Sequence, residues 1–239
     1  ENLDAAIDVL VAAGRRVHIA QAQSEIDNDR PVYRPVYRPL CCGRTFLSAV
    51  LVDQARAEMT RTVTALAPFV ARGLPVLGLE PSCLLALRDE FLSVLPGEQT
   101  QALAGQAMLL EEYLATEHEA GRLDLNLAAT GKVLLHGHCH QKAHQTMPAM
   151  NTALGLLPDI DATTVPSSCC GMAGAFGYGA DTYEVSQAMA EASLLPAVRD
   201  ANPATTLIAN GTSCRQQIKH GSGRDAVHMV QVLRRALTN

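Results

Sequence analysis

The residues of this chain that can do the most distinctive chemistry are its seven cysteines. They form a first set and a second set, which are Cys41, Cys42 and Cys83, and then Cys139, Cys169, Cys170 and Cys214. Thiolate sulfur is a soft ligand that binds zinc and iron–sulfur clusters. An odd number of cysteines, set between Ala- and Leu-rich segments, does not suit a small disulfide-stapled scaffold. The cysteines therefore indicate metal or cluster ligation in a reducing, cytoplasmic compartment.

The second half of the chain alternates predicted strands with predicted helices, and its cysteines follow the strands. The expected strands cover 132–136, 160–165 and 205–209, and the expected helices cover 141–156, 181–198 and 224–237. Such alternation predicts βαβ units and a mainly parallel sheet. Right-handed crossovers bring the turns after parallel strands to one edge of the sheet, where open α/β sheets bind ligands. The four cysteines of the second set should therefore meet at that edge.

The first half repeats this order without its opening strand. We expect a helix over 3–13, a strand over 16–20, a polar, Pro-rich loop over 21–39, a helix over 47–71, a strand over 75–79 and helices over 84–95 and 98–119. An internal repeat of this kind fixes the architecture. The fold class is thus α/β, with two pseudo-symmetric βαβ-type halves, and all seven cysteines lie in strand-to-helix turns. The halves are 1–125, which includes the connecting helix, and 126–239. Because the chain opens inside a repeat, we expect it to be part of a longer polypeptide.

Other side chains near the cysteines are further ligand candidates. His136, His138 and His140 alternate, so an extended chain places them on one face. A zinc site would recruit His138 or His140 with Cys139, whereas the alternative role for these histidines is to cap the turn or donate a hydrogen bond to sulfur. Glu80 is either a carboxylate ligand or the cap of the helix that follows it.

Several classes of function are excluded by composition. The net charge is -5 and the pI about 5.9, which does not suit a nucleic-acid surface. Aromatic residues make up only 4%, so stacking platforms for bases are not expected. No run of ~18 apolar residues exists, so we expect no transmembrane segment. The stretch 174–179 is rich in glycine but lacks the dinucleotide-binding pattern, and no nucleophile–base–acid order is present. We assign no catalytic residue.

The two Cys-Cys-Gly elements, each with a further cysteine one strand later, resemble the cysteine-rich CCG domain family. That family includes the cysteine-rich subunit of heterodisulfide reductase and the iron–sulfur subunits of glycolate oxidase and anaerobic glycerol-3-phosphate dehydrogenase. Its repeat has a lone cysteine, then Cys-Cys-Gly, then Cys-x-x-Cys. The second set of this chain matches four of those five positions and the first set matches three. The departure is at the last pair, where Gly211 and Glu80 replace the first cysteine, so a five-cysteine cluster does not fit the pattern.

Longer motifs narrow the resemblance. Leu40–Thr45, Gly78–Cys83, His136–Lys142 and Ser168–Gly174 look like the C-terminal region of FAD-linked D-2-hydroxyacid dehydrogenases of the D-lactate and D-2-hydroxyglutarate types. The resemblance implies that the cysteines hold an iron–sulfur cluster of the 4Fe-4S type, as the electron-transfer part of an oxidoreductase. It implies FAD on a separate upstream domain or subunit, and a quinone or another carrier as electron acceptor. The implied location is the cytoplasm or the inner face of the membrane.

Two rival functions remain open at this point. The first is a catalytic thiol site in which a cluster cleaves a disulfide, as in heterodisulfide reductase. The second is a structural zinc module in which His138 or His140 completes the shell. Metal content and visible colour separate the zinc module from the other two, because Zn²⁺ is colourless.

Overall fold

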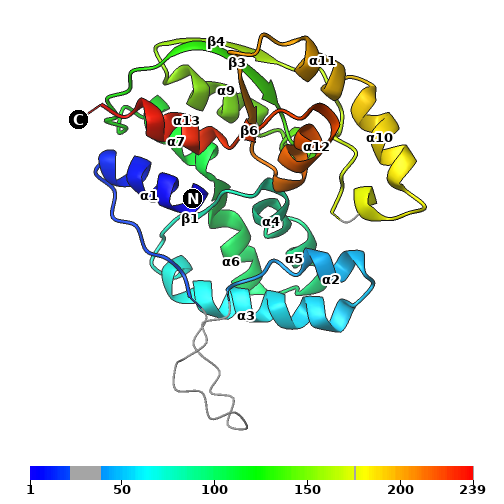
Figure 1. Ribbon diagram of the computed structural model, residues 1–239. Helices are drawn as coiled ribbons and strands as arrows, with labels where there is room; N and C mark the ends of the chain where they lie inside the picture. The colour runs from blue at the N-terminus through cyan, green and yellow to red at the C-terminus, as the bar shows by residue number, and fades with distance from the viewer. Residues whose placement is uncertain (22–38, 175, 239) are drawn as a thin grey trace, which may run out of the picture. The chain divides into compact units, whose positions relative to one another are not determined.

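The computed structural model describes residues 1–21, 39–174 and 176–238, and these form an α/β structure that is 53% helical (Figure 1). The helices are α1 Asn2–Ala12, α2 Arg44–Ser48, α3 Val52–Val70, α4 Pro81–Ala86, α5 Glu90–Val94, α6 Glu98–Gln106, α7 Leu110–Glu119, α8 Cys139–Ala143, α9 Met147–Gly155, α10 Tyr183–Glu191, α11 Leu194–Asp200, α12 Thr212–Ser222 and α13 Met229–Ala236. The strands are β1 Val76–Gly78, β2 Ala107–Leu109, β3 Thr130–His136, β4 Asp159–Thr164, β5 Thr206–Ala209 and β6 Ala226–Val227, and η1 is a 3₁₀ turn at Phe176–Tyr178.

The chain divides into two compact units. Unit 1 comprises Glu1–Val17, Leu79–Ser82 and Leu109–Asn239, and unit 2 comprises His18–Gly78 and Cys83–Met108. A compact unit and a sequence repeat are different properties, so the division into repeats 1–125 and 126–239 stays a prediction.

Unit 1 is built on a four-stranded sheet with the order β4-β3-β5-β6. All three strand pairs are parallel, and the register pairs Leu135 with Thr164 of β4 and Ile208 of β5. The chain leaves β3 for β4 on one side and then returns past β3 to β5. The strand order therefore reverses between β3 and β5, which is the position where open α/β sheets bind ligands.

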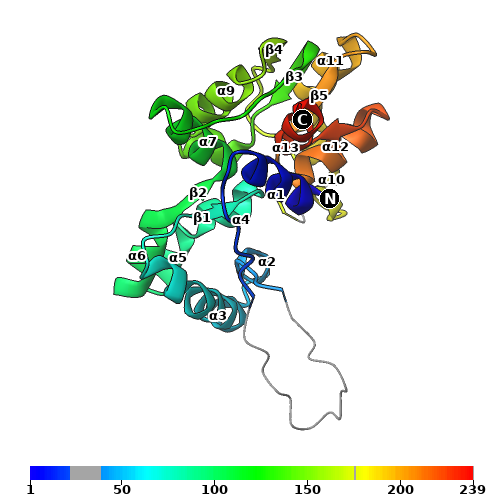
Figure 2. The ribbon, with the colours of Figure 1, turned by 90° about the vertical axis from the view of Figure 1, so that its left-hand side faces the viewer.

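Helices flank this sheet on two sides. Figure 2 shows α7 and α9 to one side of β3 and β4, and α11 and α12 to the other side. Helix α9 packs on α7 and β4, while α12 packs on α10, α11 and β5. Met172, Leu194, Val198, Leu207 and Ile218 are buried in one apolar cluster that also contains two of the cysteines. Helix α1 packs on α13.

Unit 2 centres on α3, which carries an apolar stripe. Buried Met59, Val63, Leu66 and Val70 recur every three or four residues along it. Helix α3 packs on α2, α6 and β1, and the short strands β1 and β2 form a two-stranded sheet. Within the described part of the chain, no helix combines the length and the apolar character needed to cross a bilayer.

The α/β class with parallel strands is confirmed, whereas several predicted elements are wrong in detail. The segment 16–20 has no strand partner and runs as irregular chain. The long helices predicted over 47–71, 84–95, 141–156 and 181–198 are each two shorter helices, and the one over 98–119 is interrupted by β2. Most of the loop at 21–39 lies outside the described residues.

The C-terminal prediction also needs correction. The expected single helix over 224–237 is strand β6 followed by α13, and α12 was not predicted at all. The segment Thr212–Ser222 is mostly polar, and its two apolar residues, Cys214 and Ile218, are too few to indicate an apolar helix face from the sequence alone. Because α12 begins at Thr212, Cys214 lies in the first turn of a helix and not in the loop before it.

Candidate metal centre

The second set of cysteines lies at the carboxyl ends of β3, β4 and β5, where the strand order reverses. Cys139 is the first residue of α8, three residues after β3 ends. Cys169 and Cys170 lie in the turn after β4, and Cys214 is the third residue of α12, after β5. Helix N-termini carry free N–H groups and a positive dipole end, which stabilise thiolate. Sheet topology therefore gathers four thiols that are up to 75 residues apart in sequence.

The four thiols interact as neighbours in one series: Cys139 with Cys169, Cys169 with Cys170, and Cys170 with Cys214. Because each of these interactions favours a thiol on one side and a thiolate on the other, the pKa of Cys139 and Cys170 is raised and the pKa of Cys169 and Cys214 is lowered. Burial raises the pKa of Cys139 and Cys170 further. The arrangement therefore favours thiolate at Cys169 and Cys214, and binding a metal or cluster would displace the protons that remain.

The Cys-Cys-Gly turn places both adjacent cysteines, Cys169 and Cys170, among the interacting thiols because Gly171 bends the backbone sharply. Gly171 has a φ of +85°, and its N–H donates to Sγ of Cys169 at 3.3 Å. A Cβ at this position would lie 2.2 Å from the main-chain oxygen of Ser186 in α10. Only glycine fits, because it tolerates the left-handed conformation and leaves room for α10.

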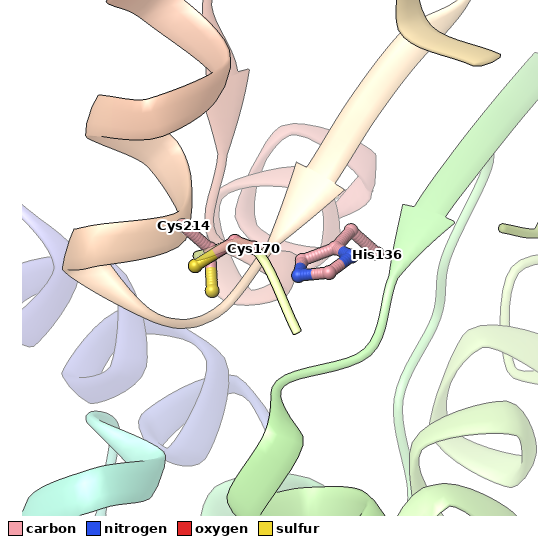
Figure 3. A group of neighbouring side chains, drawn as sticks. All are labelled: His136, Cys170 and Cys214. Carbon is pink, nitrogen blue, oxygen red and sulfur yellow. The ribbon is translucent and has the colours of Figure 1, made fainter. Parts of the chain in front are cut away.

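His136 forms a compact group with two of the cysteines. A ring nitrogen of His136 and the sulfurs of Cys170 and Cys214 lie within 4.8 Å of one another, and all three residues are buried. Figure 3 shows the ring of His136 directed at the two sulfur atoms. Nδ1 of His136 contacts the Ser167 hydroxyl at 2.8 Å, whereas Nε2 is buried with no hydrogen-bond partner among the described residues. The ring nitrogen that faces the cysteines, Nε2, is thus the one that lacks a hydrogen-bond partner among the described residues.

His138 and His140 lie at the start of α8. His138 is its N-cap, and Nδ1 of His138 accepts a hydrogen bond from the His140 N–H at 3.1 Å. Nδ1 of His138 and of His140 lie 3.9 and 3.7 Å from Sγ of Cys139, so these three residues form a second group that could hold a metal ion. A metal on Nδ1 of His138 would have to displace the cap.

The surroundings of Gly211 leave no room for a side chain. A Cβ at Gly211 would lie 2.3 Å from Cδ2 of His138 and 3.2 Å from Sγ of Cys214. Any side chain there would overlap the imidazole of His138. The ring of His138 therefore fills the space into which a cysteine at position 211 would project.

Lys142 provides positive charge beside the thiols. Its ammonium donates to the main-chain oxygens of Ser167 and Ser168. Burial lowers the pKa of Lys142, and the charges of the four cysteines oppose this shift. The cation therefore offsets part of the negative charge that thiolates bring into the site.

A buried carboxyl group ties two of the cysteine-bearing turns together, and nothing in the sequence pattern indicated it. Oε1 of Glu111 in α7 accepts hydrogen bonds from Gln141 in α8 and, at 3.1 Å, from Asn210 just before α12. Asn210 in turn accepts from the N–H of Met229 at 2.9 Å. Glu111 has no exposed surface, and burial raises its pKa to about 7. A lone Glu at an apolar position of a predicted helix would have been the only signal.

The first set of cysteines, in unit 2, is less complete. The sulfurs of Cys42 and Cys83 lie 3.2 Å apart, and the hydrogen bond between them lowers the pKa of Cys42 to about 6. Sγ of Cys41 instead accepts from the Gly43 N–H at 3.4 Å. Among the described residues, neither the three thiols of this set nor the four thiols of the second set form a group with all sulfur atoms within 4.8 Å of one another.

The two Cys-Cys-Gly turns nevertheless share one geometry. Gly43 has a φ of +74°, and a Cβ there would lie 2.9 Å from the main-chain oxygen of Ala55 in α3. Thr62 of α3 donates to the main-chain oxygen of Cys41 at 2.9 Å. In both turns, glycine adopts a positive φ, donates to the first sulfur and packs against the backbone of a helix. This likeness supports the predicted repeat.

Glu80 uses its carboxylate for capping. Oε2 accepts from both the N–H and the hydroxyl of Thr212 at 2.9 Å, and Oε1 accepts from Ser82 at 3.0 Å. Glu80 therefore caps α12, the helix of Cys214, and a cap on the helix that follows it in sequence stays a prediction. A ligand role for Glu80 stays a prediction.

The donor set of the second half fits an iron–sulfur cluster. Four neighbouring thiols, two of them in the first turn of a helix, with a cation and backbone N–H groups close by, match what such clusters use. Cys170 and Cys214 are 4% and 1% exposed and belong to the apolar cluster of unit 1, so water is largely excluded there. The first set is one sulfur short of four and does not fit a cluster by itself.

Comparison with known proteins finds relatives among dehydrogenases. The chain is 27% identical over 199 residues to one subunit of the anaerobic glycerol-3-phosphate dehydrogenase of Escherichia coli K12, covering 82% of this chain and 49% of that protein. It is 30% identical over 182 residues to D-2-hydroxyglutarate dehydrogenase of the same organism, covering 74% of this chain and 17% of that enzyme. The corresponding Pseudomonas putida enzyme is 29% identical over 241 residues, covering 97% of this chain and 20% of that enzyme.

The chain thus spans about half the length of the first relative and about a fifth of the other two. No protein-family model matches it, and no solved structure does. The similarity relates the chain to components of larger oxidoreductases.

Proposed function

We propose that this chain is the iron–sulfur electron-transfer module of an FAD-linked D-2-hydroxyacid dehydrogenase, through which electrons pass from the flavin to a quinone or another carrier. The observation that carries the proposal is the placement of Cys139, Cys169, Cys170 and Cys214 after three neighbouring parallel strands, where their thiols interact at the sheet position that binds ligands. When bound, an iron–sulfur cluster supplies one-electron redox chemistry. The relatives support the oxidoreductase context.

The residues of this chain would hold, orient and shield the cluster. The four thiols supply ligands, and Gly171 and Lys142 supply an N–H group and positive charge. The apolar cluster around Cys170 and Cys214 lowers the local dielectric, and burial of this kind tunes the reduction potential. Since we assign no acid, base or flavin loop, the oxidation of the hydroxy acid belongs to another part of the enzyme.

The first set is proposed as a secondary ligand site. Cys41, Cys42 and Cys83 occupy the matching positions of the repeat, but no step of the proposed function depends on them. The 3.2 Å separation of Cys42 and Cys83 favours a second candidate, a thiol–disulfide site in which these two sulfurs react. A Cys42–Cys83 disulfide that forms in mild oxidant and is reversed by reductant, followed by mass spectrometry, would support that candidate.

A structural zinc module is the other candidate, and the group of His138, Cys139 and His140 favours it. The cap on Nδ1 of His138 counts against it, because a metal and a backbone N–H cannot share one lone pair.

The proposed function is tested by Cys170→Ser in the complete enzyme that contains this chain and its flavin part. Rapid-mixing absorbance at the flavin band follows both half-reactions. We expect flavin reduction by substrate to stay nearly intact and reoxidation by the natural acceptor to slow strongly. A variant that has lost its iron but is reoxidised at the wild-type rate would assign the cysteines a structural role.

A further inference from the structure

The two buried imidazoles beside the cysteines have hydrogen-bond partners on their Nδ1 atoms that decide which ring nitrogen carries the proton. A backbone N–H can only donate, so Nδ1 of His138, which accepts from the N–H of His140, is unprotonated. A neutral imidazole has one N–H, and in His138 it must therefore be at Nε2.

The same conclusion holds for His136 by a different route. The Lys142 ammonium has no lone pair, so at 3.4 Å it can only donate to the Ser167 hydroxyl oxygen. Among the described contacts, the hydrogen of that hydroxyl then has one acceptor, Nδ1 of His136 at 2.8 Å. Nδ1 accepts, and Nε2 carries the proton.

The Nε2–H group of His136 is directed at sulfur. Nε2 of His136 is buried without an oxygen or nitrogen partner among the described residues, and its ring faces Cys170 and Cys214 (Figure 3). A buried N–H needs an acceptor, and thiolate sulfur is the acceptor available on this side.

We propose that His136 is a positioning residue that presents an Nε2–H donor to the sulfurs of Cys170 and Cys214, and so sets the potential of the bound cluster. The inference rests on the proposed function. Hydrogen bonds to sulfur stabilise the more negative, reduced state, because they offset added negative charge. The Ser167–Lys142 pair is the group that keeps this donor in place.

The test uses asparagine variants, because asparagine retains an acceptor at the position of Nδ1 but does not reach the position of Nε2. In the anaerobically reconstituted protein, we expect His136→Asn to keep its iron and to show a lower midpoint potential than wild type. His136→Gln, whose amide reaches the Nε2 position, should lie closer to wild type. His220→Asn is the control, since His220 is exposed at the end of α12.

An unchanged potential in His136→Asn with full iron content would overturn the inference and leave the proposed function intact. If the wild-type protein binds no cluster, both this inference and the proposed function are wrong. If the variants lose iron, the donor role is tested by pulsed EPR in D₂O on the reduced wild-type protein labelled with ¹⁵N-histidine. We expect weak nitrogen coupling and exchangeable deuterons near the cluster. Strong coupling of a directly bound nitrogen, or no nitrogen coupling, would contradict the donor role.

Discussion

The buried carboxyl group of Glu111 should make the stability of this protein depend on pH. In the folded chain, burial raises its pKa from 4.5 to about 7. Between these two values the folded chain keeps the proton and the unfolded chain releases it. The stabilisation is thus fully present below the unfolded pKa of 4.5 and is lost as the pH rises through about 7.

The size of the effect follows from the shift. One pKa unit corresponds to ~1.4 kcal/mol, so the free energy of unfolding should fall by about 2 to 3 kcal/mol between pH 5 and pH 8 because of this one group. Solvent screening takes little from this value because Glu111 has no exposed surface. Glu111→Gln removes the titration, and its amide oxygen can still accept from Gln141 and Asn210.

Urea unfolding of wild type and Glu111→Gln at several pH values measures the effect, with thiols reduced and metal chelated. We expect the variant to gain about 2 to 3 kcal/mol relative to wild type from pH 5 to pH 8. Glu119→Gln, at the exposed end of α7, is the control and should show no such trend. Parallel stability curves for wild type and Glu111→Gln would refute the buried, protonated carboxyl.

Three further predictions test the framework around the site. Gly171→Ala should lower the free energy of unfolding by more than about 2 kcal/mol and lower the iron content, because the new Cβ overlaps the α10 backbone. Gly223→Ala, at a φ of +72° with open space around it, should lower the free energy of unfolding by only about 1 kcal/mol, as measured by urea unfolding. Arg224→Ala should cost about 3 kcal/mol, seen as a lower Tm, because the guanidinium donates to four main-chain oxygens within 198–205. Glu80→Gln should leave the iron count unchanged if the carboxylate caps α12, and a lower count would make it a ligand.

The features that could be predicted from the sequence are those that depend on hydrophobic periodicity and on sheet topology. Parallel strands with cysteines after them place Cys139, Cys169, Cys170 and Cys214 at one sheet edge, and in the structure these thiols interact as neighbours. Helix boundaries were less accessible, because breaks such as the one between α8 and α9 follow from tertiary packing and not from composition. Gln145, with a φ of +57°, marks that break but is not a residue type that predicts one.

Contacts between distant side chains could not be predicted. The Glu111–Gln141–Asn210 network joins residues up to 99 positions apart, and each is an ordinary polar residue in its own segment. The fit of the His138 ring above Gly211 likewise depends on how two turns meet. Such contacts arise only once the sheet is assembled, so a single sequence carries no local signal for them.

The central claim, that the second set of cysteines holds an iron–sulfur cluster, is tested most directly by iron, zinc and acid-labile sulfide analysis of the anaerobically purified protein, with EPR of the reduced sample. We expect iron and sulfide in equal amounts and a cluster EPR signal on reduction. We expect Cys214→Ser to lose the iron, the sulfide and the EPR signal. Stoichiometric zinc without sulfide, in a colourless protein, would contradict it.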